Sequence, residues 1–253
     1  MALKFSGMSL CRSFARSNMP NAAYNLRGLQ NLGFTWSMLP GLRDLYPKQA
    51  DFVAACRRYA IFHNCHPFWG PYLTGAFLHT ERSIAAGKID PSRFGPIKEA
   101  MLNSLSAIGD SFFSGSLDTL FFMLLLVLTG LGCAGAACLF FLFWLLTALA
   151  MKIFTFYLGL SRGFQAMALL RRFDLINWGD RLKRVSAFVL LAFLTFSLRP
   201  WGRPGFSELA RLAELAHAWF LPLSMLLLFG YLAARLHYSR SLLLCLLLLL
   251  LAL

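Results

Sequence analysis

The chain has 253 residues, of which 58% are hydrophobic and only 14% are charged, against roughly a quarter charged in soluble domains. A mean hydropathy of +0.61 excludes an ordinary cytosolic protein, a disordered chain and a fibrous repeat. Lysine and arginine outnumber aspartate and glutamate by 24 to 11. In a chain this apolar, and with the basic residues scattered, we interpret the excess as marking the cytoplasmic face of a membrane rather than a nucleic-acid surface.

These patterns predict an all-α polytopic membrane protein. Prolines interrupt residues 1–118 repeatedly, so we expect interfacial and broken or re-entrant helices in the N-terminal half. Long apolar stretches dominate the rest, where we expect transmembrane helices. We therefore divide the chain into an N-terminal amphipathic, partner-contacting segment (1–50), a core of polar helix breaks (51–118) and a transmembrane region (119–253).

The first distinct pattern of the core is an amphipathic helix at residues 50–62. Its apolar residues recur at helical spacing beside two arginines, which is typical of a helix lying on a membrane surface. These apolar residues are Phe52, Val53, Cys56, Tyr59 and Ala60. Further along, Asp90-Pro91-Ser92 predicts a turn and the start of another helix.

A polar motif with aromatic neighbours follows at residues 62–71. His63 and His66 have a spacing that could hold a metal together with Cys65, but Pro67 breaks the helix that would present them and no carboxylate completes the set. Two interpretations remain open. The motif is either a helix end with aromatic interface anchors, or a polar helix break near the membrane lined by Asn64 and His66.

Glu81 lies near the end of a long uncharged stretch. It is either a ligand for a polar substrate or a structural partner of Arg82 or Lys98. The sequence alone slightly favours the structural role.

Asp110 lies in a run of small and aromatic residues at 102–116, directly before the uncharged region. A carboxylate at the edge of a bilayer is costly unless it faces a cavity. Gly109 and Gly115 would allow a sharp bend, and transporters build binding sites from such broken helices. The alternative, compatible with the first, is that Asp110 caps a helix starting at Ser111.

Residues 119–151 carry no charge and are too long for one perpendicular span of about 20 residues. A patch of small residues at 130–137 is either part of one long tilted helix or the tip of a two-pass hairpin. Basic segments on both sides favour the hairpin, with both of its ends in the cytoplasm. Further apolar segments are expected at 185–198, 218–234 and 241–253.

Complete catalytic motifs are absent from the sequence. It contains no phosphate-binding glycine loop, no Gly-x-Ser-x-Gly elbow and no His-Glu-x-x-His pair. We therefore predict neither an enzyme nor a cofactor or metal site.

Taken in order, the motifs of residues 14–118 resemble the IID component of mannose-family (mannose/fructose/sorbose-type) phosphotransferase systems. A looser match continues at 154–163. The residues that carry the resemblance are Phe14-Ala15-Arg16-Ser17-Asn18, Tyr24-Asn25, Leu29-Gln30-Asn31-Leu32-Gly33-Phe34, Met38-Leu39-Pro40, Leu45-Tyr46-Pro47, Arg57-Arg58-Tyr59, the stretch from Phe62 to Phe68, Glu81, Ile97-Lys98, Ile108-Gly109-Asp110-Ser111, Phe113 and Gly115.

The resemblance implies a membrane permease subunit of the bacterial inner (cytoplasmic) membrane. Such a IID subunit would form the sugar channel with a IIC membrane subunit, and cytoplasmic IIB, recharged by IIA, would phosphorylate a hexose-type sugar. Segment 51–118 would then contribute to the sugar pathway. As its polar groups we predict Asp110, Asn64, His66 and Glu81, because carboxylate and amide groups suit sugar hydroxyls. Phe112 or Trp69 would offer a stacking face.

The chain differs from the family pattern at a few positions within these motifs. The pattern has tryptophan where this chain has Ser114, and further departures fall at Arg27-Gly28, Asn103, Ser104, Ala107 and Asp118. Two alternatives to a transporting subunit therefore stay open: a scaffold that only folds and orients IIC, and a diverged, inactive IID.

Overall fold

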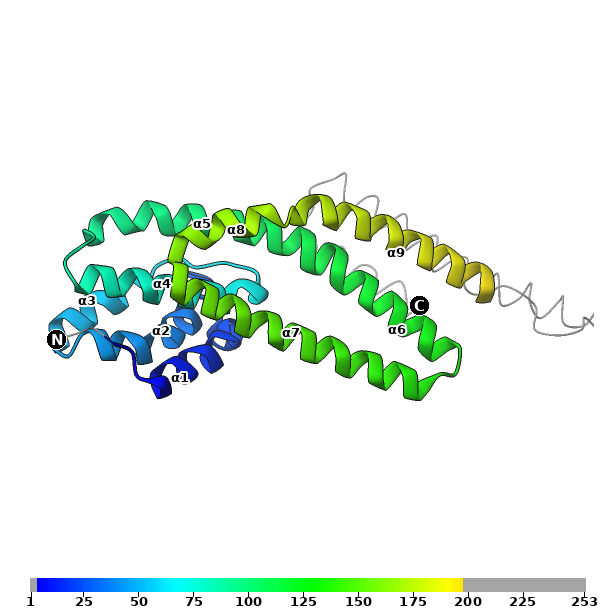
Figure 1. Ribbon diagram of the computed structural model, residues 1–253, viewed down its shortest axis with the longest axis horizontal. Helices are drawn as coiled ribbons and strands as arrows, with labels where there is room; N and C mark the ends of the chain where they lie inside the picture. The colour runs from blue at the N-terminus through cyan, green and yellow to red at the C-terminus, as the bar shows by residue number, and fades with distance from the viewer. Residues whose placement is uncertain (1–3, 198–253) are drawn as a thin grey trace, which may run out of the picture. The chain divides into compact units, whose positions relative to one another are not determined.

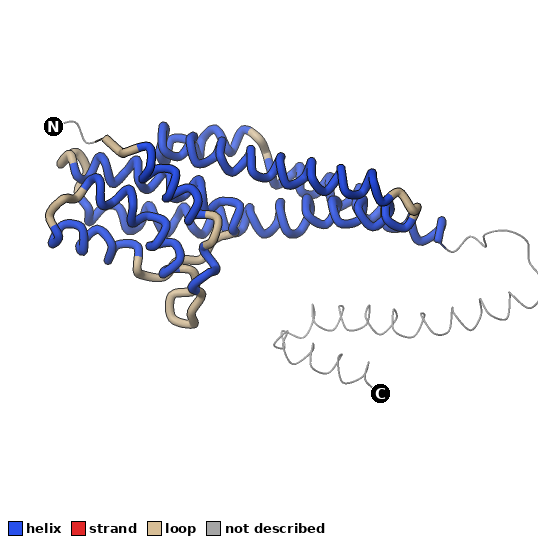
Figure 2. The backbone as a smooth tube through the Cα atoms, turned by 90° about the horizontal axis from the view of Figure 1, so that it is seen from below, coloured by secondary structure: helices blue, strands red, loops and turns tan. Residues whose placement is uncertain are grey.

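The computed structural model describes residues 4–197, which are helical almost throughout (Figures 1 and 2). Within this range there is no β-strand, only isolated bridges that join Leu29 to Asn25 and to His63. The helices are α1 (Gly7–Ser17), α2 (Asn31–Leu45), α3 (Gln49–Tyr59), α4 (Gly70–Ala85), α5 (Phe94–Gly109), a π-helix (Asp110–Leu117), α6 (Asp118–Gly130), α7 (Ala134–Arg162), α8 (Ala166–Arg172) and α9 (Leu175–Ser197).

The predicted all-α class is thus confirmed for the described residues, of which 4–194 belong to one structural unit. The apolar segment expected at 185–198 is the C-terminal part of α9, as far as Ser197. The segments expected at 218–234 and 241–253 lie outside the described residues. The turn at Asp90 is confirmed, since its side chain accepts a hydrogen bond from the Ser92 N–H at 2.9 Å and α5 follows directly.

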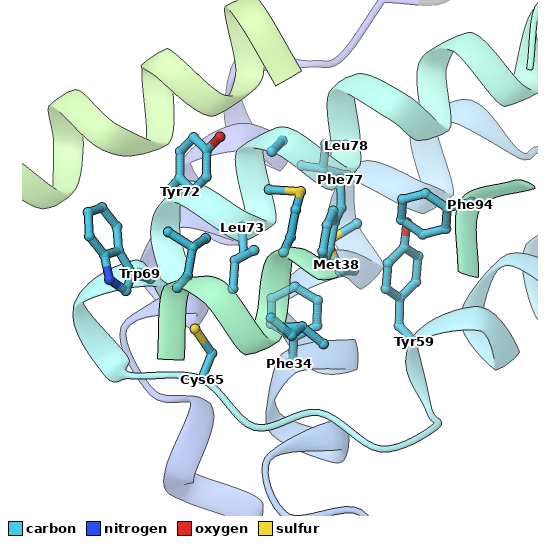
Figure 3. Packing of buried hydrophobic residues seen from close by; sticks show 14 of the residues in the cluster. Phe34, Met38, Tyr59, Cys65, Trp69, Tyr72, Leu73, Phe77, Leu78 and Phe94 are labelled. Carbon is cyan, nitrogen blue, oxygen red and sulfur yellow. The ribbon is translucent and has the colours of Figure 1, made fainter. Parts of the chain in front are cut away.

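Helix α3 confirms the amphipathic helix predicted at 50–62, but its apolar face packs against protein. Phe52, Ala55 and Tyr59 are buried. They join an aromatic core built from α2, α4 and the start of α5 (Figure 3). Tyr59 lies 5.9 Å from Phe77, ring centre to ring centre. The N-terminal helices therefore form a folded bundle with its own core.

Helices α4 and α7 cross at two glycines. A Cβ atom at Gly75 would overlap the backbone oxygen of Phe156, and one at Gly159 would overlap that of Tyr72. Only glycine permits this approach, which lets the two backbones lie almost in contact. The crossing holds the N-terminal bundle on the long helix α7.

The helical hairpin predicted for residues 119–151 is confirmed, with its turn in the small-residue patch at 130–137, and its two membrane crossings stay a prediction. α6 ends at Gly130, the chain turns with Gly132 at a φ of +73°, and α7 returns beside α6 (Figure 1). Phe121 stacks on Trp144 across the pair, with ring centres 4.6 Å apart. Within the described residues, Pro91–Gly130 and Ala134–Arg172 are long and apolar enough to cross a membrane.

The bend predicted around Asp110 is wrong, and so is the prediction that Asp110 caps a new helix. Asp110 has helical angles (φ −62°, ψ −42°), and the helix continues into the π-helix. The hydroxyls of Ser116 and Thr119 donate to the carbonyl oxygens five residues earlier, those of Ser111 and Ser114, at 2.7 and 3.1 Å. The wider π-helical turn thus satisfies backbone groups that a break would have exposed.

Candidate functional site

Residues His66, Phe68, Asp110, Ser114 and Lys152 form a polar cluster on the π-helix, called the Asp110 cluster below. The π-helix supplies Asp110 and Ser114, the segment before α4 supplies His66 and Phe68, and α7 supplies Lys152. π-helical segments are rare and frequent at functional sites. Here the π-helix coincides with the motif that the sequence singled out.

His66 connects two parts of this cluster. Its Nε2 atom lies 2.9 Å from the Ser114 hydroxyl, within hydrogen-bond distance. Gly109 makes the contact possible, because a Cβ atom there would overlap the His66 side chain. Burial lowers the pKa of His66 below its usual range, the Asp110 carboxylate acts in the opposite direction, and Lys152 adds to the lowering. His66 is therefore a neutral imidazole at pH 7.

The two charged members of the cluster differ in exposure. Asp110 is exposed, and within residues 4–197 its carboxylate makes no hydrogen bond or ion pair. Lys152 is half-buried, and its ammonium lies 5.1 Å from the centre of the Phe68 ring. An open carboxylate beside an imidazole, a hydroxyl and an aromatic ring can accept and donate hydrogen bonds to a polyhydroxyl ligand.

On its other side the π-helix is covered by α9, which the sequence did not predict. Gly179 packs against Phe112 and Ser116, where a Cβ atom would come within 3.2 Å of the Ser116 hydroxyl. Lys183 reaches the Ser111 hydroxyl at 3.4 Å. In the sequence, this contact is marked only by Gly179 and by Lys183 one helical turn later. Such a pair is too common to predict a contact.

Behind the cluster lies a cavity of about 240 Å³ between Trp69, α5, α8 and the start of α9. Trp69 is fully buried, and its indole N–H has no hydrogen-bond partner among the residues that the structure describes. Of the two predicted stacking residues, Trp69 therefore faces this cavity rather than the surface. Phe112 is half-buried and packs edge-on against Phe113 at 5.1 Å.

Asn64 lies two residues before His66, on a loop fixed by backbone contacts. The His63 carbonyl accepts from the Gln30 N–H at 2.9 Å, and the Cys65 N–H donates to the Gln30 side chain at 3.0 Å. The Asn64 side chain itself is exposed. The fold thus brings Asp110 and His66 together and leaves Asn64 accessible near them along the chain.

Glu81 lies in a different place, the Glu81 cluster of Tyr46, Arg58, Tyr59, Glu81 and Lys98. Its carboxylate is completely buried. Arg58 donates to both carboxylate oxygens, at 3.0 and 2.6 Å, and the hydroxyls of Tyr46 and Tyr59 donate at 2.7 and 2.8 Å. The partner of Glu81 is therefore Arg58, not Arg82 or Lys98. Lys98 lies beside them, donating to the Arg58 carbonyl at 3.0 Å.

Burial and the Glu81 charge both shift the pKa values of the groups that donate hydrogen bonds in this cluster. Burial, together with Glu81, raises the pKa of Tyr46 and of Tyr59 well above the usual range. Burial alone would lower the pKa of Arg58, but its hydrogen bonds and attraction to Glu81 raise it. All three groups therefore stay protonated and keep donating to the carboxylate.

The part of the chain that the structure describes is helical, has two membrane-capable helices and carries an open polar cluster beside them, a combination expected of helical membrane transport proteins. Comparison with known proteins defines the family: the model of the PTS system mannose/fructose/sorbose family IID component matches residues 4–194. The chain belongs to this family, which is the one that the sequence motifs predicted.

Individual relatives agree with this assignment. The chain is 31% identical over 161 residues to the sorbose-specific EIID component of Klebsiella pneumoniae, covering 63% of this chain and 59% of that protein. It is 32% identical over 152 residues to the mannose-specific EIID component of Escherichia coli K12, covering 59% and 54%. The matches thus span little more than half the length of these relatives.

A solved structure shows the same fold. The cryoEM structure of the mannose transporter ManYZ in complex with microcin E492 (MceA) contains a chain that is 27% identical to this one, with a TM-score of 0.56. The similarity covers 79% of this chain and 72% of that chain.

Proposed function

We propose that this chain is a sugar-permease subunit that forms a translocation path with a IIC subunit in the bacterial inner membrane. Cytoplasmic IIB, recharged by IIA, phosphorylates the arriving hexose-type sugar. The observation that carries the proposal is the open Asp110 carboxylate beside His66 and Ser114 on the π-helix. The named relatives, which are components of sorbose- and mannose-specific systems, support the substrate class.

In this proposal the α6–α7 hairpin crosses the membrane twice. Asp110 precedes the turn at Leu131 by about 21 residues, and Lys152 follows Ala134 by about 18, which correspond to roughly 30 and 27 Å of helix. The hydrocarbon core is about 30 Å thick. Asp110 and Lys152 therefore lie at the same membrane boundary, where a sugar leaves or enters water.

We propose further that Asp110, His66 and Asn64 contact the sugar and that Glu81 does not. Glu81 lies 11 residues beyond Gly70 on α4, about 17 Å from the start of that helix. Its carboxylate already accepts four hydrogen bonds from protein groups. Glu81 thus holds the bundle together, the structural role that the sequence left open.

The scaffold alternative gave Asp110 only a capping role. Asp110 lies inside a continuous helix, and its carboxylate accepts no hydrogen bond from a backbone N–H within residues 4–197. The fold therefore has no evident structural need for a carboxylate there, which favours a role in binding.

The test is calorimetric sugar binding by the purified complex with IIC, comparing wild type with Asp110→Asn. Charge-assisted hydrogen bonds contribute about 1.5–3 kcal/mol, so affinity should fall roughly tenfold to a hundredfold. The yield of the complex should stay the same, because the carboxylate is exposed. Asp51→Asn, an exposed aspartate on α3, is the matched control and should bind like wild type. Unchanged affinity in an intact Asp110→Asn complex would remove Asp110 from the site.

A further inference from the structure

A groove between α1 and α2 carries positive charge that the fold does not neutralise. It has a volume of about 350 Å³ and is lined by Arg12 and Arg16 of α1, by Arg43 of α2 and by Phe52 of α3. The two ion pairs of the described residues are Arg58–Glu81 and Asp180–Lys183, so none of the three groove arginines takes part in one.

One carboxylate, Asp44, also lines the groove, but its hydrogen bonds go to the start of α1. Its oxygens accept from the Ser6 N–H at 2.7 Å and from the Ser9 hydroxyl at 3.0 Å. Asp44 thus satisfies the N-terminal end of α1, where the helix dipole favours a negative charge. Three guanidinium groups against one engaged carboxylate leave the groove cationic.

Two of the guanidinium groups are held in place by aromatic rings. Arg16 lies 4.7 Å from the Trp36 ring centre and donates one N–H to the Trp36 carbonyl at 3.2 Å. Arg43 lies 3.7 Å from the Phe52 ring centre and donates to Gln49 at 2.9 Å. A guanidinium held this way has further N–H donors free, in the planar geometry that suits a phosphate group.

Helix α1, which forms one wall of the groove, packs against the membrane-capable helix α7. Phe14 of α1 contacts Phe156 of α7 edge-on, with ring centres 5.5 Å apart. Phe156 is four residues, roughly 6 Å, beyond Lys152. In the membrane arrangement proposed above, α1 is therefore level with the phospholipid headgroups. Trp36, 40% exposed beside the groove, is a residue typical of this interfacial layer.

We propose that this groove binds the phosphate of an anionic phospholipid through Arg12, Arg16 and Arg43. The inference rests on the proposed membrane arrangement but not on sugar binding, so each can fail without the other. Arg12, which is exposed and makes no hydrogen bond or ion pair within residues 4–197, supplies the free contact, and the two stacked arginines supply the fixed ones. The lipid would fasten the N-terminal bundle to the membrane surface next to the transport helices.

The experiment is native mass spectrometry of the full chain, in the membrane complex with which it purifies, offered phosphatidylglycerol and phosphatidylcholine with identical acyl chains. Wild type should retain phosphatidylglycerol at least roughly tenfold better, since juxtamembrane arginines each favour anionic lipid measurably. The triple variant Arg12→Gln/Arg16→Gln/Arg43→Gln should lose this preference. The matched triple Arg27→Gln/Arg57→Gln/Arg93→Gln removes exposed arginines elsewhere and should keep it.

Two further measurements test the lipid assignment: a single variant of Arg12 and competition by inorganic phosphate. The single variant Arg12→Gln removes no hydrogen bond or ion pair within residues 4–197 and should still reduce the preference severalfold, even if the triple variant folds poorly. Inorganic phosphate at millimolar concentration should not displace the lipid; if it does, the groove binds soluble anions and the lipid assignment fails. Equal retention of both lipids by wild type, or equal loss in the two triple variants, overturns the proposal.

Discussion

The Glu81 and Asp110 clusters place the same functional group in opposite surroundings. The Glu81 carboxylate is fully buried and accepts hydrogen bonds from Arg58, Tyr46 and Tyr59. The Asp110 carboxylate is exposed and, within residues 4–197, has no such partner. The Glu81 carboxylate is satisfied by groups of the fold, whereas the Asp110 carboxylate is free to bind a ligand.

The burial and hydrogen bonding of a carboxylate distinguish a structural role from a binding role better than its residue type does. A buried carboxylate survives only when donors surround it, and removing one member of such a set leaves the remaining charge uncompensated. An exposed carboxylate costs the fold little and keeps its full capacity for a ligand. The contrast predicts that stability will be sensitive in the first cluster and ligand binding in the second.

Glu81→Gln should have the largest effect on stability. It removes the charge opposite the Arg58 guanidinium, whose side chain is only 21% exposed. Breaking a buried pair from one side costs about 3–5 kcal/mol, so the melting temperature of the purified complex should fall sharply. Glu99→Gln on α5 is the control: Glu99 is exposed, and its removal should change stability by less than about 0.5 kcal/mol. Similar melting curves for the two variants would contradict a structural role for Glu81.

Sequence patterns predicted the features of this molecule that depend on neighbouring residues in the chain. Helix periodicity predicted α3, the uncharged run predicted the α6–α7 hairpin, and the motif order predicted the family. The first two signals each lie within one stretch of chain, and the third is the order of short motifs along residues 14–118. The order of the motifs also identified Asp110 and His66 together, although 44 residues separate them.

Contacts between distant segments could not be read in this way. Arg58 and Glu81 are 23 residues apart, and nothing in their neighbourhoods distinguishes that pairing from Arg82 or Lys98. The glycines around Asp110 predict a bend where the structure has a π-helix, because glycine permits both. The outcome depends on hydroxyls such as that of Ser116, which donates a hydrogen bond within the helix. The groove arginines are spread over two helices and become one site only through packing.

The second largest effect is expected on the pH dependence of stability, and it tests His63, which packs beside the Glu81 cluster. Its ring stacks on Phe34 with centres 3.8 Å apart, and burial, with a smaller effect of Lys98, lowers its pKa from 6.5 to about 3. Below pH 6.5 the His63 imidazole therefore binds a proton in the unfolded chain but stays neutral in the folded chain. The free energy of unfolding falls as the pH drops toward 3. Between pH 7 and pH 5 the loss should be about 2 kcal/mol.

His63→Phe keeps a ring against Phe34 and removes the titrating group. Melting temperatures of wild type and variant should be measured at pH 7 and pH 5, and the readout is the difference between the two pH values. The drop should shrink markedly in the variant, with a remainder from His66, whose pKa is lowered in the same direction. A drop of the same size in both proteins would show that His63 is not protonated on unfolding in this range.

The smallest effect is expected at Ser114, where the resemblance led us to expect tryptophan. Ser114→Ala removes the 2.9 Å contact with His66 that links the π-helix to the segment before α4. Because Ser114 is exposed, water can replace the lost partner, so unfolding should become easier by only about 1 kcal/mol or less. Ser104→Ala on α5, also exposed and without a side-chain hydrogen bond within residues 4–197, provides the baseline. If Ser114→Ala destabilised the protein as much as Glu81→Gln, the Asp110 cluster would be a closed structural network like the other one. Its open carboxylate would then no longer point to a ligand.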